Sequence, residues 1–134
     1  MGCGKTLTAI AIAGAAYEKG EIEKVLVVAP TSVCNVWPKE FKDYADFKYK
    51  VNVLLGDKKK RLQELEALKN FPFKALKVAV INYESTWREG LFEALLDWNP
   101  DMVIADESQR IKTPDAEQSK AMHQIGDIAK YKLI

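Results

Sequence analysis

The sequence predicts an α/β fold in which helices cover both faces of a mostly parallel sheet, so that the domain has three layers. Short apolar runs alternate with longer helical segments from one end of the chain to the other. The runs are rich in Val and Ile and are apolar at consecutive positions, which is typical of parallel strands buried on both faces. This alternation indicates right-handed β–α–β crossovers. With 134 residues, the chain has the length of a single domain.

The helices are expected from composition and from the residues that flank them. Residues 6–19 are rich in Ala, Leu and Ile, and Gly20 suits the left-handed position that follows many helices. Ser32 is a candidate cap for a helix over 32–44, with Pro38 in or near its first turns. The other helices are expected at residues 58–69, 85–98 and 115–129, and the strands at residues 25–29, 51–55, 77–82, 101–105 and 131–134.

Two features of the sequence can be interpreted either structurally or functionally. The basic run 58–61 opens the predicted helix 58–69, and we interpret it as a solvated first turn rather than a contact with a nucleic acid backbone. Trp37, Trp87 and Trp98 could stack on bases, but large aromatic residues at helical spacing more often belong to a core. We therefore expect all three tryptophans to be core residues.

Composition and charge argue against several classes of protein. The 20 basic and 19 acidic residues nearly cancel, so any contact with a polyanion must be a local patch. Cys3 and Cys34 do not make a disulfide framework, which favours an intracellular setting. No apolar run approaches the roughly 20 residues that span a bilayer. We expect a protein with no membrane partner, cytoplasmic in a bacterial or phage-like context or nuclear in a eukaryote.

The start of the chain matches the second half of a phosphate-binding loop. In the full pattern G-x-x-x-x-G-K-[ST], backbone N–H groups surround the phosphates, the lysine reaches the outer ones and the hydroxyl ligates Mg²⁺. Gly4, Lys5 and Thr6 fill the last three positions, and a helix follows directly, as an anion site requires. By itself the match is either a nucleotide site that begins within its motif or an accident of composition.

Two adjacent carboxylates make the nucleotide site more credible. Asp106 and Glu107 directly follow the apolar run that ends at Ala105. In an ATPase with a phosphate-binding loop, the first carboxylate at such a strand end holds Mg²⁺ and the second polarises the attacking water. An Asp-Glu pair after a strand is common, and so is a short glycine-rich segment. Their combination, with an α/β pattern between them, is specific.

Four segments of the chain resemble the SWI/SNF-type ATPases of superfamily-two helicases. Residues 1–7 look like that family's M-G-L-G-K-T-L, and residues 29–41 resemble its A-P-x-S-L-x-x-N-W-x-x-E-F segment. Residues 81–84 are similar to the T-Y-E segment, and residues 106–112 look like the D-E-A-H-R-I-K box. The resemblance covers nearly the whole chain in the right order and spacing. It implies the fold of a P-loop NTPase, that is, a RecA-like lobe.

The resemblance also implies the chemistry of the site. ATP and Mg²⁺ would be the cofactors, and the complete protein would use hydrolysis to move on duplex DNA. Lys5 would neutralise the β and γ phosphates, and Glu107 would orient the hydrolytic water. Thr6 and Asp106 would hold Mg²⁺. The residues around the nucleotide would be Gly2, Cys3, Gly4, Lys5, Thr6 and Leu7.

Further residues are assigned to nucleic acid and to coupling by the same resemblance. Thr31, Ser32, Tyr83 and Glu84 would lie near the nucleic-acid groove, where hydroxyl and N–H groups meet phosphate oxygens. The other interpretation is that Ser32 caps a helix and Tyr83 packs on the sheet. Gln109 replaces the usual histidine and can still donate and accept hydrogen bonds, so it is the candidate for coupling the nucleotide to a second RecA-like lobe.

The departures from the pattern and the ends of the chain leave alternatives open. Asn82 stands where threonine is usual, and Ser108 precedes Gln109 in place of alanine. Residues 1–134 are expected to be a partial lobe, truncated at both ends and lacking the strand before the phosphate-binding loop, with little activity alone. The second lobe is likewise expected to lie outside the chain. Another P-loop NTPase or phosphotransferase and an inactive, truncated binding module remain the alternative functions.

Overall fold

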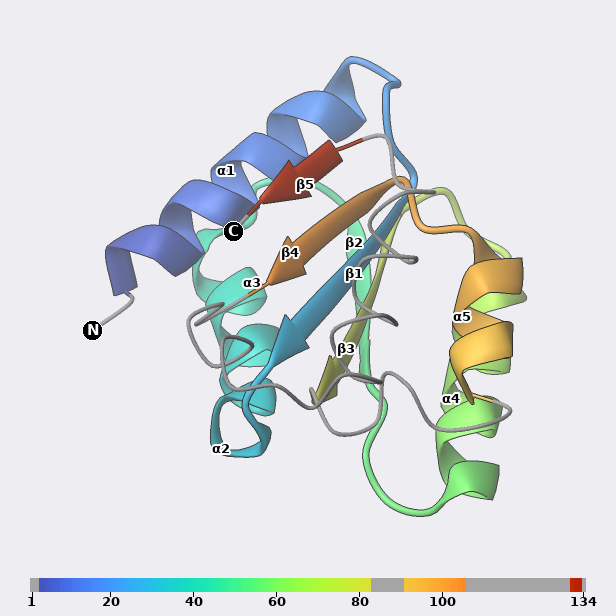
Figure 1. The fold of residues 1–134 in the computed structure, drawn as a ribbon. Coiled ribbons are helices and arrows are strands. Elements are labelled where there is room, and N and C mark those ends of the chain that lie inside the picture. The colour runs from blue at the N-terminus through green and yellow to red at the C-terminus, as the bar shows by residue number, and fades with distance from the viewer. Residues whose placement is uncertain (1–2, 83–90, 106–130, 134) are drawn as a thin grey trace.

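The computed structural model describes residues 3–82, 91–105 and 131–133 (Figure 1). None of the described helices is long and apolar enough to cross a membrane. The helices are α1 (Cys3–Glu18), α2 (Thr31–Cys34), α3 (Val36–Tyr44), α4 (Lys58–Lys69) and α5 (Leu91–Trp98). The strands are β1 (Lys24–Ala29), β2 (Tyr49–Val53), β3 (Leu76–Asn82), β4 (Met102–Ala105) and β5 (Tyr131–Leu133).

The strands form one sheet in the order β2-β3-β1-β4-β5, and every pair in it is parallel. The parallel sheet predicted from the doubly apolar runs is thereby confirmed. Strands β1, β3 and β4 at its centre are buried at nearly every position. Strand β5 is the terminal strand of the described sheet on the β4 side.

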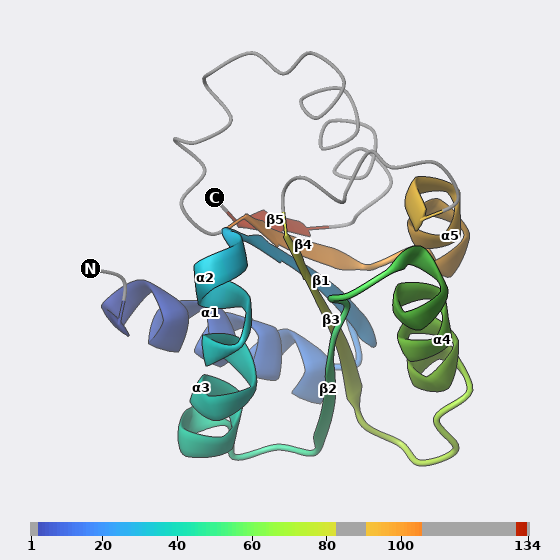
Figure 2. The same ribbon diagram turned by 90° about the horizontal axis from the view of Figure 1, so that it is seen from below.

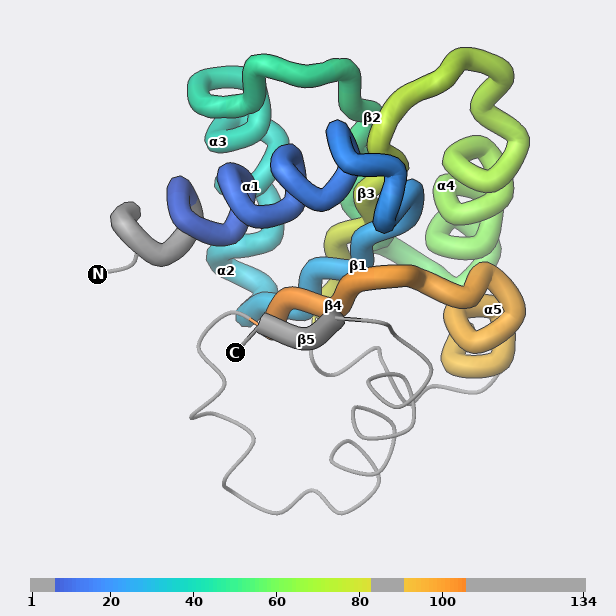
Figure 3. Tube along the Cα trace, turned by 90° about the horizontal axis from the view of Figure 1, so that it is seen from above, coloured from blue at the N-terminus to red at the C-terminus, as the bar shows by residue number. Residues whose placement is uncertain are grey.

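Helices cover both faces of the sheet, as predicted. Helices α1 and α3 pack on one face and α4 and α5 on the other, which is plain in Figure 2 and, from above, in Figure 3. Successive residues of a strand point to opposite faces. In β1, Val25 and Val27 therefore join the core under α1 and α3, and Leu26 and Val28 join the core under α4 and α5. This alternation explains why the strand must be apolar throughout.

Helix α1 begins three residues earlier than predicted and ends as expected. It starts at Cys3 and runs to Glu18. Gly20 takes a φ of +76°, its N–H donates to the Tyr17 carbonyl, and the N–H of Glu21 donates to the Ala16 carbonyl. These two bonds are those of a Schellman motif, which satisfies carbonyls that the helix end leaves without partners. The predicted role of Gly20 is confirmed.

The single helix predicted over residues 32–44 is wrong in two respects. The segment is divided at Asn35 into α2 and α3. Pro38 lies in the first turn of α3 and has no N–H, so it cannot donate to the Cys34 carbonyl and the helical ladder cannot continue across the junction. Ser32 is not a cap either, because α2 begins at Thr31 with Pro30 before it and no side chain caps it.

Strand β2 lies two residues earlier than predicted. It runs over Tyr49–Val53 and pairs with Leu76–Val80 of β3. The apolar pattern suggested residues 51–55 because it ends in two leucines, whereas Leu54 and Leu55 already lead to Gly56. Gly56 has a φ of +103°, in the left-handed region that favours glycine, and turns the chain into α4.

Helix α4 has its predicted bounds, and its first turn corrects one interpretation. Lys58, Lys59 and Lys60 are exposed, as a solvated turn requires. Arg61 is only 7% exposed, so the basic run is not solvated throughout. Trp37 and Trp98 are 2% and 3% exposed, which confirms their prediction as core residues. Trp87 and the predicted helix at 115–129 lie outside the described residues.

The start of α4 permits a test of the fold. The side chain of Asp57 accepts a hydrogen bond of 2.8 Å from the N–H of Lys60 and caps the helix. We expect Asp57→Ala to lower the free energy of unfolding by about 1 kcal/mol, since a lost N-cap costs roughly that much. Urea denaturation measures the change. Asp46→Ala, at an exposed aspartate outside the helices, should leave the free energy unchanged, and an equal loss in both variants would contradict the capping role.

Candidate functional site

The carboxyl ends of three adjacent strands meet at one edge of the sheet, and most of the predicted site residues follow these ends. In the register of the sheet, Val28 lies beside Ala105, and Ala29 lies beside Asn82. The segments that leave β1, β3 and β4 therefore start side by side. In open α/β sheets, ligands bind at the carboxyl ends of the strands. We call this edge the carboxyl edge.

The first turn of α1 is oriented toward the same edge. Helix α1 leads into the start of β1 and runs back against its direction, so that α1 begins on the side to which the arrowheads of β1, β4 and β5 point (Figure 1). The first four N–H groups of a helix have no acceptor within it and carry the positive end of the helix dipole. Cys3, Gly4, Lys5 and Thr6 make up this turn. Leu7, which follows them, is 44% exposed.

The predicted nucleic-acid residues that the structure describes lie at the carboxyl edge too. Thr31 and Ser32 open α2, directly after β1, and both are exposed. The side-chain amide of Asn82, at the end of β3, donates a 2.9 Å hydrogen bond to the Thr31 hydroxyl oxygen. Sequence reasoning noted Asn82 only as a departure from a pattern. The signal it missed is a polar residue that closes an otherwise apolar strand.

The remaining predicted residues lie outside the described residues, and their roles stay predictions. They are Gly2 of the phosphate-binding loop, Tyr83 and Glu84, the carboxylates Asp106 and Glu107, and Gln109. For the carboxylates the described chain gives one constraint, since Asp106 is the residue after Ala105 at the end of β4. The structure thus brings the first turn of α1 and the ends of β1, β3 and β4 to one edge.

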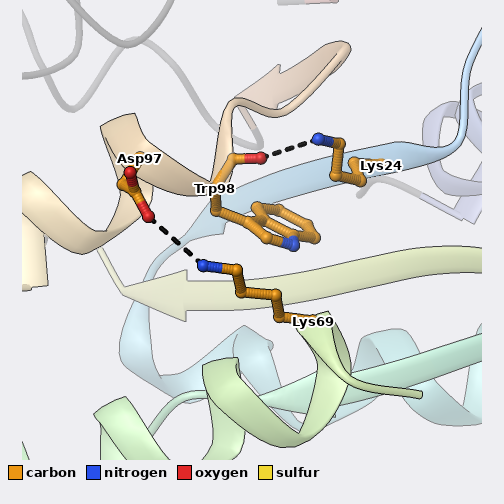
Figure 4. A network of polar contacts seen from close by, with 4 residues as sticks. All are labelled: Lys24, Lys69, Asp97 and Trp98. Carbon is orange, nitrogen blue, oxygen red and sulfur yellow. Dashed lines mark hydrogen bonds and ion pairs between the residues drawn. The ribbon is translucent and has the colours of Figure 1, made fainter.

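The opposite edge of the sheet carries polar contacts of a different kind. The Asp101 carboxylate accepts hydrogen bonds from the N–H groups of Glu23 and Lys24, at 2.9 and 3.1 Å. The Lys24 ammonium donates to the Trp98 carbonyl at 2.8 Å (Figure 4). These bonds fasten the turn after α5 to the start of β1. They are structural contacts at the start of β1, whereas the predicted site residues follow the carboxyl ends of the strands.

A pocket lies between the two helices α4 and α5. Its volume is about 400 Å³, and Leu62, Leu65, Ala94 and Trp98 contribute apolar lining. Lys69 and Asp97, which form an exposed ion pair of 3.3 Å, also line it (Figure 4). Its lining residues belong to α4, α5 and Asn70, and these two helices lie on the other face of the sheet from α1. It is therefore separate from the site at the carboxyl edge.

Comparison with known proteins decides the family. A family model described as the SNF2-related domain matches residues 1–134. The chain belongs to the SNF2-related domain family. This confirms the resemblance to SWI/SNF-type ATPases that the sequence motifs suggested.

Individual relatives and a solved structure agree with this assignment. "Switch 2" of Arabidopsis thaliana is 31% identical over 136 residues, which cover 93% of this SNF2-related domain and 15% of the relative. "DNA repair and recombination protein RAD54-like" of Drosophila persimilis is 31% identical over 125 residues, 86% of this chain and 16% of the relative. The solved "Sulfolobus solfataricus SWI2/SNF2 ATPase core in complex with dsDNA" matches with a TM-score of 0.73 and 25% identity, over 99% of this chain and 25% of that chain.

These matches also show how much of each relative's length the chain covers. The chain spans about 15% of the length of the two curated relatives. The structural match confirms the predicted fold class, an α/β lobe of the kind found in SWI2/SNF2 ATPase cores.

Proposed function

We propose that this SNF2-related domain is the nucleotide-binding lobe of an ATP-dependent motor that moves on duplex DNA. The observation that carries the proposal is the carboxyl edge, where the first turn of α1 and the ends of β1, β3 and β4 come together. Membership of the SNF2-related family supports a nucleotide-driven activity. The match to an ATPase core solved with double-stranded DNA supports duplex DNA as the partner.

The residue types expected at the carboxyl edge would suit a nucleotide and a magnesium ion. The N–H groups of the first turn of α1 can donate to phosphate oxygens, and Lys5 in that turn would add a positive charge. Thr6 and Asp106 would supply the hydroxyl and carboxylate oxygens that Mg²⁺ prefers. When bound, Mg²⁺ would supply neutralisation of charge on the transferred phosphoryl group. Glu107 would accept a proton from the attacking water and orient it.

The DNA would lie along the other end of the same edge. Thr31, Ser32, Tyr83 and Glu84 follow β1 and β3, which are neighbours in the sheet. Hydroxyl and N–H groups at such positions would contact phosphate oxygens and position the duplex without reading its sequence. Gln109 would connect the nucleotide to a second RecA-like lobe in the complete protein. The second lobe would supply the remaining charges around the phosphates.

A comparison of activators tests the proposal. We expect ATP turnover by the full-length natural protein to rise several-fold when duplex DNA is added, and not when single-stranded RNA or small hydroxyl compounds are added. Steady-state phosphate release with each addition measures the effect. The same assay on residues 1–134 alone should give negligible turnover. Stimulation by a small acceptor in place of DNA would favour a phosphotransferase and contradict the proposal.

A further inference from the structure

We propose that Asn82 is a positioning residue for DNA binding, because it holds the Thr31 hydroxyl in the orientation that donates to a phosphate oxygen. The inference rests on the proposed function and deepens it, since it adds a residue from β3 to the part of the carboxyl edge that would contact DNA. It depends on one interaction, the 2.9 Å hydrogen bond from the Asn82 Nδ2 to the Thr31 Oγ1.

The two partners differ in exposure in the way that this role requires. Asn82 is 7% exposed and closes β3, a strand that is otherwise apolar apart from Lys77. Thr31 is exposed and is the first residue of α2. A buried amide at the end of a strand has few conformations available, because the strand fixes its backbone and the core confines its side chain. The hydrogen bond from Asn82 therefore connects the exposed threonine to a rigid part of the sheet.

The backbone around Thr31 is held by other bonds. Ala29 lies beside Asn82 in the parallel register of β1 and β3. The Pro30 carbonyl accepts hydrogen bonds from the N–H groups of Val33 and Cys34, at 2.9 and 3.2 Å, and these bonds close the turn of α2. This backbone thus has hydrogen bonds of its own, and the Asn82 amide contacts the side chain of Thr31 rather than this backbone turn.

The direction of the hydrogen bond determines what the hydroxyl can offer. A threonine hydroxyl has one proton to donate and two lone pairs that accept. The Thr31 Oγ1 accepts a hydrogen bond from the Asn82 amide. The hydroxyl proton of Thr31 is therefore directed away from that amide. A DNA phosphate oxygen can only accept, so it needs that proton. An aspartate at position 82 would reverse the arrangement, because its carboxylate would accept the hydroxyl proton and add a negative charge beside the phosphate path.

The experiment compares duplex DNA binding by variants of the full-length natural protein, measured by fluorescence anisotropy at one fixed salt concentration. Thr31→Val and Asn82→Ala should each weaken binding about three- to tenfold, the range for one hydrogen bond. The double variant should bind no more weakly than Thr31→Val alone. Asn82→Asp, which keeps the volume of the side chain, should weaken binding more than Asn82→Ala. The DNA concentration that half-saturates ATP turnover should rise by the same factors.

Asn52 provides a matched control. It is the other buried asparagine of the sheet, 8% exposed, and its Nδ2 donates a 2.9 Å hydrogen bond to the Glu64 carbonyl of α4. It lies on β2, in a contact between strand and helix. Asn52→Ala removes a comparable buried amide, so it should lower stability as Asn82→Ala does but leave the DNA dissociation constant unchanged.

The outcomes separate this inference from the proposed function. If Thr31→Val weakens DNA binding but Asn82→Ala and Asn82→Asp do not, the inference is overturned and the proposed function stands. Equal weakening by Asn82→Ala in the wild-type and Thr31→Val backgrounds would also overturn it, since Asn82 would then act independently of Thr31. If the wild-type protein does not bind duplex DNA, the proposed function fails and the inference falls with it.

Discussion

Replacing Glu107 by glutamine is expected to lower the DNA-stimulated ATP turnover of the full-length natural protein by about 10²- to 10⁴-fold, the usual contribution of a general base. The amide has nearly the same size as the carboxylate but cannot accept a proton from water. ATP binding should be preserved, because Lys5 and the first turn of α1 would still contact the phosphates. Phosphate release at saturating duplex DNA measures turnover, and fluorescence titration with a labelled nucleotide measures binding.

Glu66 provides the control for this substitution. It is an exposed glutamate on α4, on the other face of the sheet from α1. Glu66→Gln makes the same chemical change away from the carboxyl edge and should leave turnover and nucleotide binding unchanged. Undiminished turnover in the Glu107→Gln protein would remove the residue from the proposed mechanism. Loss of nucleotide binding in the same variant would instead assign Glu107 to the binding of the nucleotide.

The central strands of the fold were predictable because each is encoded locally. Runs such as Val25–Ala29 are apolar at every position, and only a strand buried on both faces needs that pattern. Gly20 marked the end of α1 correctly in advance, since it takes a positive φ angle. The order of the strands was not predicted, because it depends on pairings such as that of Ala29 with Asn82, which are distant in sequence.

The errors arose where a tertiary contact or a single missing N–H outweighs the local pattern. The break between α2 and α3 follows from Pro38, whose effect on the preceding turn decides the boundary. Strand β2 begins at Tyr49 because β3 provides partners from Leu76 onward, which composition does not encode. Arg61 belongs to a basic run, yet its place on α4 turns it inward, beside the leucines of the helical face.

The candidate site was predictable as a set of motifs but not as a set of contacts. The first turn of α1 and the carboxylates after β4 were recognised from residue types and spacing, and their chemistry remains a prediction. The bond between Asn82 and Thr31 joins residues 51 positions apart, and it exists because β1 and β3 are neighbours. The sequence shows which residues are present, whereas the pairing of the strands in the sheet determines which of them are in contact.

Removing the Phe41 ring should cause the largest loss of stability. Phe41 is fully buried on α3. Its ring centroid lies 6.3 Å from that of Trp37, 6.4 Å from that of Phe47 and 5.3 Å from that of Tyr49. Phe41 therefore connects α3 to the edge strand β2. We expect Phe41→Ala to lower the free energy of unfolding by about 3–5 kcal/mol, the usual cost when a buried aromatic ring leaves a cavity.

Hydrogen exchange in the full-length natural protein measures the loss of stability separately for each helix and strand. The amides of α3 and β2 should exchange faster in Phe41→Ala, since both elements pack on the missing ring, while those of α4 and α5 on the opposite face should change least. Phe73→Ala serves as the control, because Phe73 is 70% exposed and its removal should change stability by about 0.5 kcal/mol or less. A loss below about 1 kcal/mol in Phe41→Ala would mean that the cavity collapses, and would contradict a rigid aromatic contact between α3 and β2.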